Sequence, residues 1–120
     1  MKQHILFVDD DVPLRETLSL YFKMKGISVT VAESGAEARE LVQKNSFNLA
    51  IVDLDLGGEK GMELLDFFKR IYPSLPVIMF TSLGYDPALV REAIEKGAHA
   101  YLSKTESLDT LLKEAQKAMT

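Results

Sequence analysis

Hydrophobic residues along this chain follow two alternating patterns. Short apolar runs rich in β-branched residues are separated by longer segments with helical spacing, and the runs occupy residues 5–8, 27–31, 49–52, 77–80 and 98–102. A short continuous apolar run indicates a strand buried on both faces, and regular alternation of such strands with helices indicates a parallel sheet. The pattern therefore predicts an α/β fold built from repeated βα units.

Local signals predict where the helices begin and which faces they bury. Ser34 with Glu37 forms a capping box that opens the second helix, and Asp86 before Pro87 is an N-cap that opens the fourth. The last helix is expected to start near Ser107. The predicted apolar faces contain Leu14, Leu18, Tyr21 and Phe22 in the first helix, Leu64, Leu65, Phe68 and Ile71 in the third, and Leu108, Leu111, Leu112 and Ala115 in the fifth.

Right-handed crossovers with helices on both faces make a doubly wound, five-stranded parallel sheet the simplest arrangement of these units. We expect the flavodoxin-like strand order 2-1-3-4-5. In that order the chain reverses direction beside strands 1 and 3, and open α/β sheets bind ligands outside the carboxyl ends of the strands at this point. The residues that follow each strand are therefore the first candidates for a functional site.

Polar residues are concentrated at these predicted strand ends. They are Asp9, Asp10 and Asp11 after the first strand, Asp53 and Asp55 after the third, Thr81 after the fourth, and Lys104 after the fifth. Carboxylates from neighbouring strands would raise one another's pKa unless a cation offsets their charge. Oxygen ligands with open positions suit Mg²⁺, or Mn²⁺, better than zinc. The sequence thus predicts a divalent metal site at this edge of the sheet.

Asp53 is the candidate nucleophile of this site. An ionised carboxylate can attack phosphorus without a general base and form an acyl phosphate. The Lys104 ammonium and the Thr81 hydroxyl are the donors needed to hold the remaining phosphoryl oxygens. Asp53 is therefore predicted to accept a phosphoryl group.

Five segments of the chain, in this order and spacing, resemble the receiver domains of bacterial two-component response regulators. They are ILFVDDD at 5–11, LAIVDLDL at 49–56, GMELL at 61–65, PVIMFTS at 76–82 and GAHAYLSK at 97–104. The resemblance covers essentially the whole chain, so residues 1–120 are expected to form one receiver domain.

The resemblance implies a role for each site residue. Asp53 would take a phosphoryl group from a histidine kinase or a histidine phosphotransfer protein. Mg²⁺ would be ligated by Asp10, Asp53 and the backbone carbonyl of Asp55, with Asp9 acting through a metal-bound water. The family's pattern further places Thr81 and Lys104 on the phosphoryl group.

The resemblance also implies a switch and its partners. Tyr101 would change rotamer as Thr81 moves, which would remodel the surface of the fourth helix, fifth strand and fifth helix for an output domain or target protein. A kinase would dock near Leu14, Arg15 and Leu18. Homodimerisation through the switch surface is an arrangement that the sequence leaves open.

Three positions depart from the family's usual pattern. Thr105 follows Lys104 where a proline with a cis bond is usual, so the loop either keeps a non-proline cis bond or runs trans and shifts Lys104. Gly57 replaces a common proline, and with Gly58 it is expected to loosen the loop and weaken metal binding. The Asp55 carboxylate is expected to alter the lifetime of the phosphorylated state.

Simpler interpretations and two rival functions exist for these residues. Asp11 is better explained as the N-cap or first-turn acid of the first helix than as a ligand. A pseudo-receiver that binds partners without phosphorylation is the main alternative function. A haloacid-dehalogenase-like phosphatase is the other, because Asp53 and Asp55 match that family's spacing of nucleophile and acid, but its motif lies on the first strand.

Composition excludes several classes of protein and of functional site. The 120 residues are 47% hydrophobic and contain no cysteine, which suits one domain and excludes disulfides, Cys-ligated zinc and thiol catalysis. Acids outnumber Lys and Arg by 18 to 14, and the dispersed basic residues do not suggest nucleic-acid binding by this chain alone. No apolar stretch approaches the roughly 20 residues of a membrane span, and a cytoplasmic location is expected.

Overall fold

The computed structural model describes residues 2–120. Within these residues, five parallel strands form one sheet in the order β2-β1-β3-β4-β5. The strands are β1 (His4–Val8), β2 (Ser28–Ala32), β3 (Leu49–Val52), β4 (Val77–Thr81) and β5 (Ala100–Ser103). The predicted doubly wound sheet and its strand order are confirmed, with β2 and β5 beginning one or two residues later than expected.

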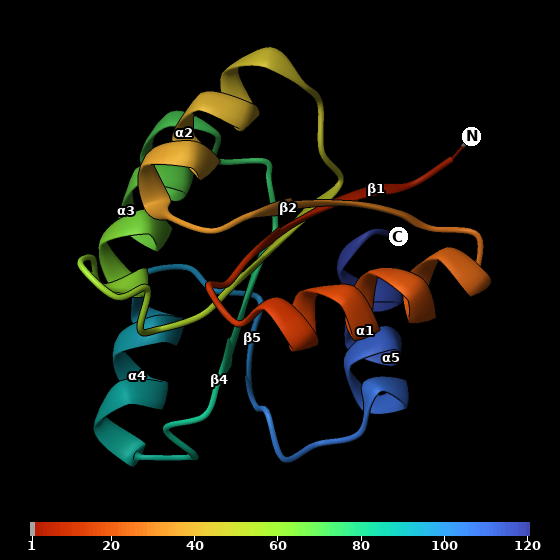
Figure 1. The fold of residues 1–120 in the computed structure, drawn as a ribbon. Coiled ribbons are helices and arrows are strands. Elements are labelled where there is room, and N and C mark those ends of the chain that lie inside the picture. The colour runs from red at the N-terminus through yellow and green to blue at the C-terminus, as the bar shows by residue number, and fades with distance from the viewer. Residues whose placement is uncertain (1) are drawn as a thin grey trace.

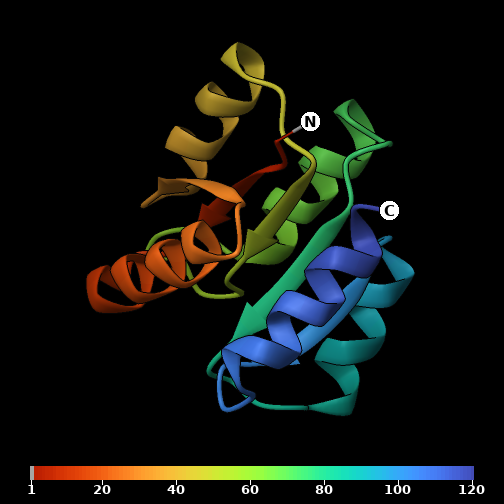
Figure 2. The same cartoon turned by 90° about the vertical axis from the view of Figure 1, so that its right-hand side faces the viewer.

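Helices cover both faces of the sheet. They are α1 (Val12–Met24), α2 (Gly35–Lys44), α3 (Gly61–Ile71), α4 (Pro87–Glu95) and α5 (Leu108–Ala118). Figure 1 shows α2, α3 and α4 on one side of the sheet and α1 and α5 on the other, and Figure 2 brings α1 and α5 toward the viewer. In residues 2–120, no helix has both the length and the apolar character needed to span a membrane.

Two hydrophobic clusters, one on each face, hold the layers together. Successive side chains of a strand point to opposite faces, so β1 sends Leu6 and Val8 toward α2 and α3, and Ile5 and Phe7 toward α1 and α5. All four of these side chains are fully buried. The sheet is therefore the rigid centre of the domain, and its strand ends are fixed in position relative to one another.

The predicted helix starts are confirmed by their capping hydrogen bonds. Asp11 caps α1 and accepts a hydrogen bond from the Leu14 N–H at 3.2 Å. Ser34, Asp86 and Ser107 cap α2, α4 and α5 in the same way. These bonds satisfy backbone donors that the first helical turn leaves free, so they set where each helix leaves the loops at the strand ends.

One predicted placement in the third helix is wrong, and one in the first is confirmed. Ile71 is 52% exposed, because Tyr72, one position further along, turns toward the core at the end of α3 instead. Leu18 is fully buried against the sheet, as its place on the predicted apolar face of this helix requires, and kinase docking on the surface near it stays a prediction. Leu14 and Arg15 keep partial exposure at the start of the same helix.

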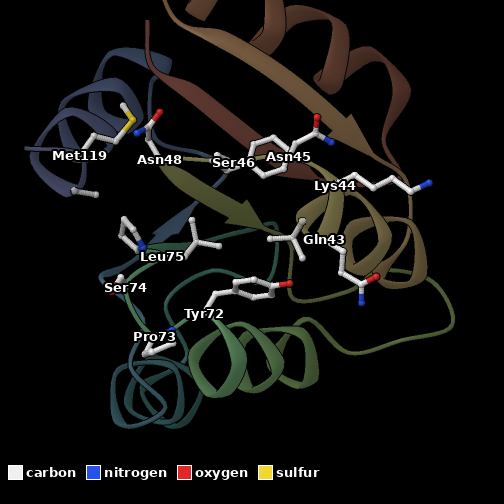
Figure 3. Close-up of a pocket in the computed structure, with 14 residues that line it drawn as sticks. Gln43, Lys44, Asn45, Ser46, Asn48, Tyr72, Pro73, Ser74, Leu75 and Met119 are labelled. Atoms are coloured by element: carbon white, nitrogen blue, oxygen red, sulfur yellow. The ribbon is translucent and has the colours of Figure 1, made fainter. Parts of the chain in front are cut away.

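A cavity of about 660 Å³ opens at the amino-terminal edge of the sheet. Figure 3 shows it between the end of α2, the loop after α3 and the end of α5, with Tyr72 and Leu75 among the labelled side chains. The residues that line it include none of the predicted site residues, which lie at the carboxyl ends of the strands. The candidate chemistry is therefore at the opposite edge of the sheet.

Candidate functional site

Three carboxylates meet at the carboxyl ends of β1 and β3. One oxygen from each of Asp9, Asp10 and Asp53 lies within 4.8 Å of the other two. The strands bring them together because Val8 pairs with Val52 at the ends of neighbouring strands. Asp9 and Asp53 are buried, whereas Asp10 is exposed at the rim. The structure thus forms the acidic cluster that the strand ends suggested.

Lys104 reaches this cluster from the end of β5. Its Nζ lies 2.7 Å from Asp9 Oδ2 and 2.8 Å from Asp53 Oδ2. Throughout the described residues every peptide bond is trans, including the bond between Lys104 and Thr105. The trans alternative therefore holds in this structure, and the Lys104 ammonium still lies between the two buried carboxylates.

The charges of the site act on one another through a partly desolvated environment. Burial raises the pKa of the Asp53 carboxyl and the charge of Asp9 adds to this, while the Lys104 ammonium opposes both. Burial also disfavours the charged form of Lys104, but the hydrogen bond to Asp53 and the nearby charge of Asp9 outweigh it and raise the pKa of Lys104. The lysine is thus held as a fixed positive charge beside Asp53.

The donor set fits a hard divalent cation. Three carboxylates share one ammonium, which leaves an excess of negative charge in a small volume. The Asp9 Oδ2 atom is buried and has no well-directed hydrogen bond within residues 2–120, although the Lys104 ammonium lies close to it. Carboxylate oxygens without nitrogen or sulfur ligands match the preference of Mg²⁺.

Asp55 begins the loop that joins β3 to α3. Its N–H lies 3.3 Å from Asp53 Oδ1, and its own Oδ1 accepts a hydrogen bond from the Gly57 N–H at 3.1 Å. At the end of the loop, the Gly61 N–H donates to the Leu54 carbonyl at 2.7 Å. The Asp55 carboxylate is therefore engaged within its own turn. The loosening expected from Gly57 and Gly58 stays a prediction.

Thr81 and Tyr101 contact the same loop, which joins β4 to α4. The buried Thr81 accepts a hydrogen bond from the Leu83 N–H at 3.1 Å through its Oγ1. The Tyr101 hydroxyl donates to the Gly84 carbonyl at 2.7 Å, and the ring is 7% exposed. The two residues predicted to form the switch are therefore bonded to two consecutive residues of one loop, Leu83 and Gly84, and their coupled motion stays a prediction.

Sequence reasoning missed one ion pair beside the site. Arg39 in α2 donates two hydrogen bonds to the Glu59 carboxylate in the loop after β3, at 3.1 and 2.6 Å. The residues are 20 positions apart and neither lies at a strand end. Their contact depends on where the side of α2 meets this loop, so no local pattern could have identified the pair.

Comparison with known proteins gives a consistent family. The model of the response regulator receiver domain matches residues 5–116. The transcriptional regulatory protein GlrR of Escherichia coli (strain K12) is 34% identical over 116 residues, which are 97% of this chain and 26% of that protein. The uncharacterized transcriptional regulatory protein YkoG of Bacillus subtilis (strain 168) is 29% identical, with 98% of this chain and 51% of that protein covered. The chain thus spans a quarter to a half of these relatives.

Solved structures agree with the sequence relatives. A CheY-like receiver domain protein from Methanospirillum hungatei JF-1 superposes with a TM-score of 0.93 at 26% identity, covering 99% of this chain and 94% of that one. The NtrX receiver domain from Brucella abortus gives 0.89 at 29% identity, with 96% and 97% covered. A Burkholderia pseudomallei response regulator, described with a phosphorylated aspartic acid, calcium ion and citrate, gives 0.89 at 25% identity over 98% and 69%.

The five-stranded parallel sheet and its strand order agree with the receiver-domain fold of these structures. The family model spans nearly the whole chain, and the relatives align over nearly all of it as well. These matches all indicate the same family. The chain belongs to the response regulator receiver domains of two-component signalling.

Proposed function

We propose that Asp53 accepts a phosphoryl group from a histidine kinase or a histidine phosphotransfer protein. The observation that carries this proposal is the position of Lys104, whose ammonium lies 2.8 Å from Asp53 at the centre of the acidic cluster. This ammonium can stabilise the negative charge of an incoming phosphoryl group. The Thr81 hydroxyl, at the end of the neighbouring strand, supplies a further donor.

The cluster would hold Mg²⁺, or Mn²⁺, through Asp10, Asp53 and the backbone carbonyl of Asp55, with Asp9 acting through water. When bound, the cation supplies positive charge that offsets the carboxylates and the phosphoryl oxygens. Without it, the three carboxylates repel one another and a phosphoryl group as well. We therefore expect phosphorylation to depend on the cation.

The transfer itself requires little beyond alignment. A carboxylate oxygen of Asp53 forms a bond to phosphorus as the bond between phosphorus and the donor's histidine nitrogen breaks, and the nitrogen keeps that electron pair. Asp53 needs no base because it is already ionised at neutral pH. Hydrolysis of the acyl phosphate later restores the carboxylate, so the chain modifies itself stoichiometrically and is not a turnover enzyme.

Phosphorylation would act on the rest of the domain through Thr81 and Tyr101. Both residues bond to the loop between β4 and α4, so movement of Thr81 toward the phosphoryl group would be transmitted to that loop. The surface of α4, β5 and α5 would then change for an output domain, a target protein or a second copy of the chain. We expect this chain to act in the cytoplasm, without direct contact with nucleic acid or membrane.

The decisive experiment treats the protein with acetyl phosphate and MgCl₂ and measures its mass. We expect a gain of one phosphoryl group that requires the cation and is absent in Asp53→Asn. A gain that persists in Asp53→Asn would show that another residue is modified.

Two other results would favour the rival functions. An unchanged mass would favour a pseudo-receiver that works by binding alone. Repeated turnover of an aryl phosphate would favour a phosphatase, although the match to the receiver family over residues 5–116 argues against it.

A further inference from the structure

The loop that follows Asp53 is attached to α2 by a single two-pronged ion pair. Arg39 Nη1 lies 3.1 Å from Glu59 Oε1, and Arg39 Nη2 lies 2.6 Å from Glu59 Oε2. The side chains are only 32% and 22% exposed, so solvent screens the pair less than an ordinary surface pair. Parallel hydrogen bonds from a planar guanidinium fix both distance and orientation.

Both partners of this pair are held in place by their surroundings. The Arg39 guanidinium lies over the Phe67 ring of α3, 5.1 Å from its centre, and this contact restrains it. The Glu59 carboxylate occupies the space beside Gly35, the first residue of α2, where any Cβ would overlap with Glu59 Oε1. The start of a helix also favours a negative charge. Gly35 is therefore required for Glu59 to lie where it does.

Glu59 is joined to the proposed metal ligand through the backbone of one closed turn. The Glu59 carbonyl accepts a hydrogen bond from the Leu56 N–H at 3.1 Å, and Asp55 forms an antiparallel bridge with Lys60. Asp55 thus lies between Asp53 and a turn whose far side is fixed by Glu59. The tip of the turn also approaches the cluster, because a Cβ at Gly57 would lie 3.6 Å from Asp10 Oδ2.

We propose that Arg39 and Glu59 are positioning residues that hold the backbone carbonyl of Asp55 in place for the divalent cation. This inference rests on the proposed function, since it concerns the same metal site. The ion pair fixes the turn before the cation binds, so the backbone of Asp55 loses less conformational freedom on binding. It also offsets the flexibility that Gly57 and Gly58 give to the turn.

The test is the affinity of the unphosphorylated domain for Mg²⁺, measured by calorimetric titration. We expect Arg39→Met and Glu59→Gln each to raise the dissociation constant roughly tenfold, as is typical when a group supporting a metal ligand is lost. The double variant is expected to bind no more weakly than either single variant, because both remove one interaction. Arg39→Lys should fall between, since lysine keeps the charge without the two-pronged geometry.

A matched control lies on the same helix. Glu40 and Lys44 form an exposed ion pair in α2 that does not touch the loop, so Glu40→Gln and Lys44→Met should leave Mg²⁺ affinity unchanged. Gly35→Ala provides a second route, because it keeps both charges but displaces Glu59, and it should weaken binding as Glu59→Gln does. Circular dichroism and thermal melting verify that each variant is folded at the titration temperature.

The outcomes separate this inference from the proposed function. If the unaltered protein binds no Mg²⁺, or if Asp53→Asn binds Mg²⁺ as tightly as the unaltered protein does, the proposed metal site is disproved. If the unaltered protein binds Mg²⁺ and the folded Arg39 and Glu59 variants bind it equally tightly, the ion pair is merely structural and the positioning role is wrong. Faster amide exchange at Leu56 and Gly61 in the cation-free variants would accompany the expected result.

Discussion

Lys104 donates a hydrogen bond to Asp53 over 2.8 Å, although the two residues are 51 positions apart in the sequence. β4 lies between β3 and β5 in the sheet, so the lysine side chain has to extend across the end of β4 to reach the acid. Its Nζ also lies 2.7 Å from Asp9. One ammonium from the end of β5 therefore reaches the ends of β1 and β3, neither of which pairs with β5, and it supplies the positive charge of a cluster of three carboxylates.

Replacing this ammonium should destabilise the cation-free domain. Lys104→Met leaves buried Asp9 and Asp53 without a positive partner, and breaking a buried ion pair in this way costs about 3 kcal/mol. MgCl₂ should recover part of the lost free energy of unfolding, because the cation offsets the same carboxylates. Urea unfolding of both proteins in EDTA and in MgCl₂ measures this difference.

Lys96→Met is the control for this substitution. Lys96 forms an ion pair with Asp66 at 2.8 Å on a more exposed part of the surface. The loss should stay below about 1 kcal/mol and should not respond to MgCl₂. An equal response of both variants to MgCl₂ would contradict the role assigned to Lys104.

Asp53→Asn should change how stability depends on pH in EDTA. Burial raises the pKa of Asp53 above its ordinary value of 3.8, so its charged form is less favourable in the folded state than in the unfolded state. The folded protein accordingly loses stability relative to Asp53→Asn as the pH rises from about 4 through the pKa of Asp53. Urea unfolding of both proteins across this range should give a difference that grows toward neutral pH, and a constant difference would refute the shift.

Much of the fold was predictable because its signals are local. Apolar runs located the strands, and Ser34, Asp86 and Ser107 marked helix starts through hydrogen bonds that reach only two or three residues along the chain. The error at Ile71 shows the limit of this reasoning. Helical spacing permits either position 71 or position 72 to face the core, and the way the backbone leaves α3 decides for Tyr72.

The site also contains residues that were predictable from local signals and residues that were not. Its acids and Lys104 were predictable because parallel strands place their carboxyl ends at one edge, so position at a strand end implies proximity. No such rule relates Arg39 to Glu59, because their contact depends on where the side of α2 meets a loop. The hydrogen bond between the Asp55 carboxylate and Gly57 was also not predicted, because the same sequence is compatible with an Asp55 carboxylate that makes no bond within the turn.

Tyr101→Phe tests the link between Tyr101 and the loop after β4. The variant loses the hydrogen bond from the hydroxyl to the Gly84 carbonyl while the ring stays packed, so the free energy of unfolding should fall by about 1 kcal/mol. Amide exchange should accelerate in the loop between β4 and α4. Tyr85→Phe removes from the same loop a hydroxyl that donates to Glu106 on the exposed side of the loop, and it should change the exchange of the loop less than Tyr101→Phe does. Equal exchange in Tyr101→Phe and the unaltered protein would remove the structural basis for the switch.

Adding one methyl group should have opposite effects on stability at two glycines that follow Asp53, Gly58 and Gly61. A Cβ at Gly61 would overlap with the Asp53 carbonyl oxygen, whereas a Cβ at Gly58 would meet no atom within 4 Å. Gly61→Ala must therefore push the start of α3 away from the backbone of Asp53, which should cost about 2 kcal/mol of stability. Because the overlap is with the backbone of Asp53 itself, Mg²⁺ affinity and the rate of phosphorylation by acetyl phosphate should fall as well.

Gly58→Ala is the matched substitution in the same loop. It should not weaken Mg²⁺ affinity or slow phosphorylation, and it should stabilise the fold by up to about 0.5 kcal/mol, because alanine restricts the unfolded chain more than glycine does. Urea unfolding, Mg²⁺ titration and phosphorylation rates of the two variants give the comparison. If Gly61→Ala loses stability but keeps Mg²⁺ affinity, the start of α3 is important for folding only, and the metal site does not depend on the position of the loop.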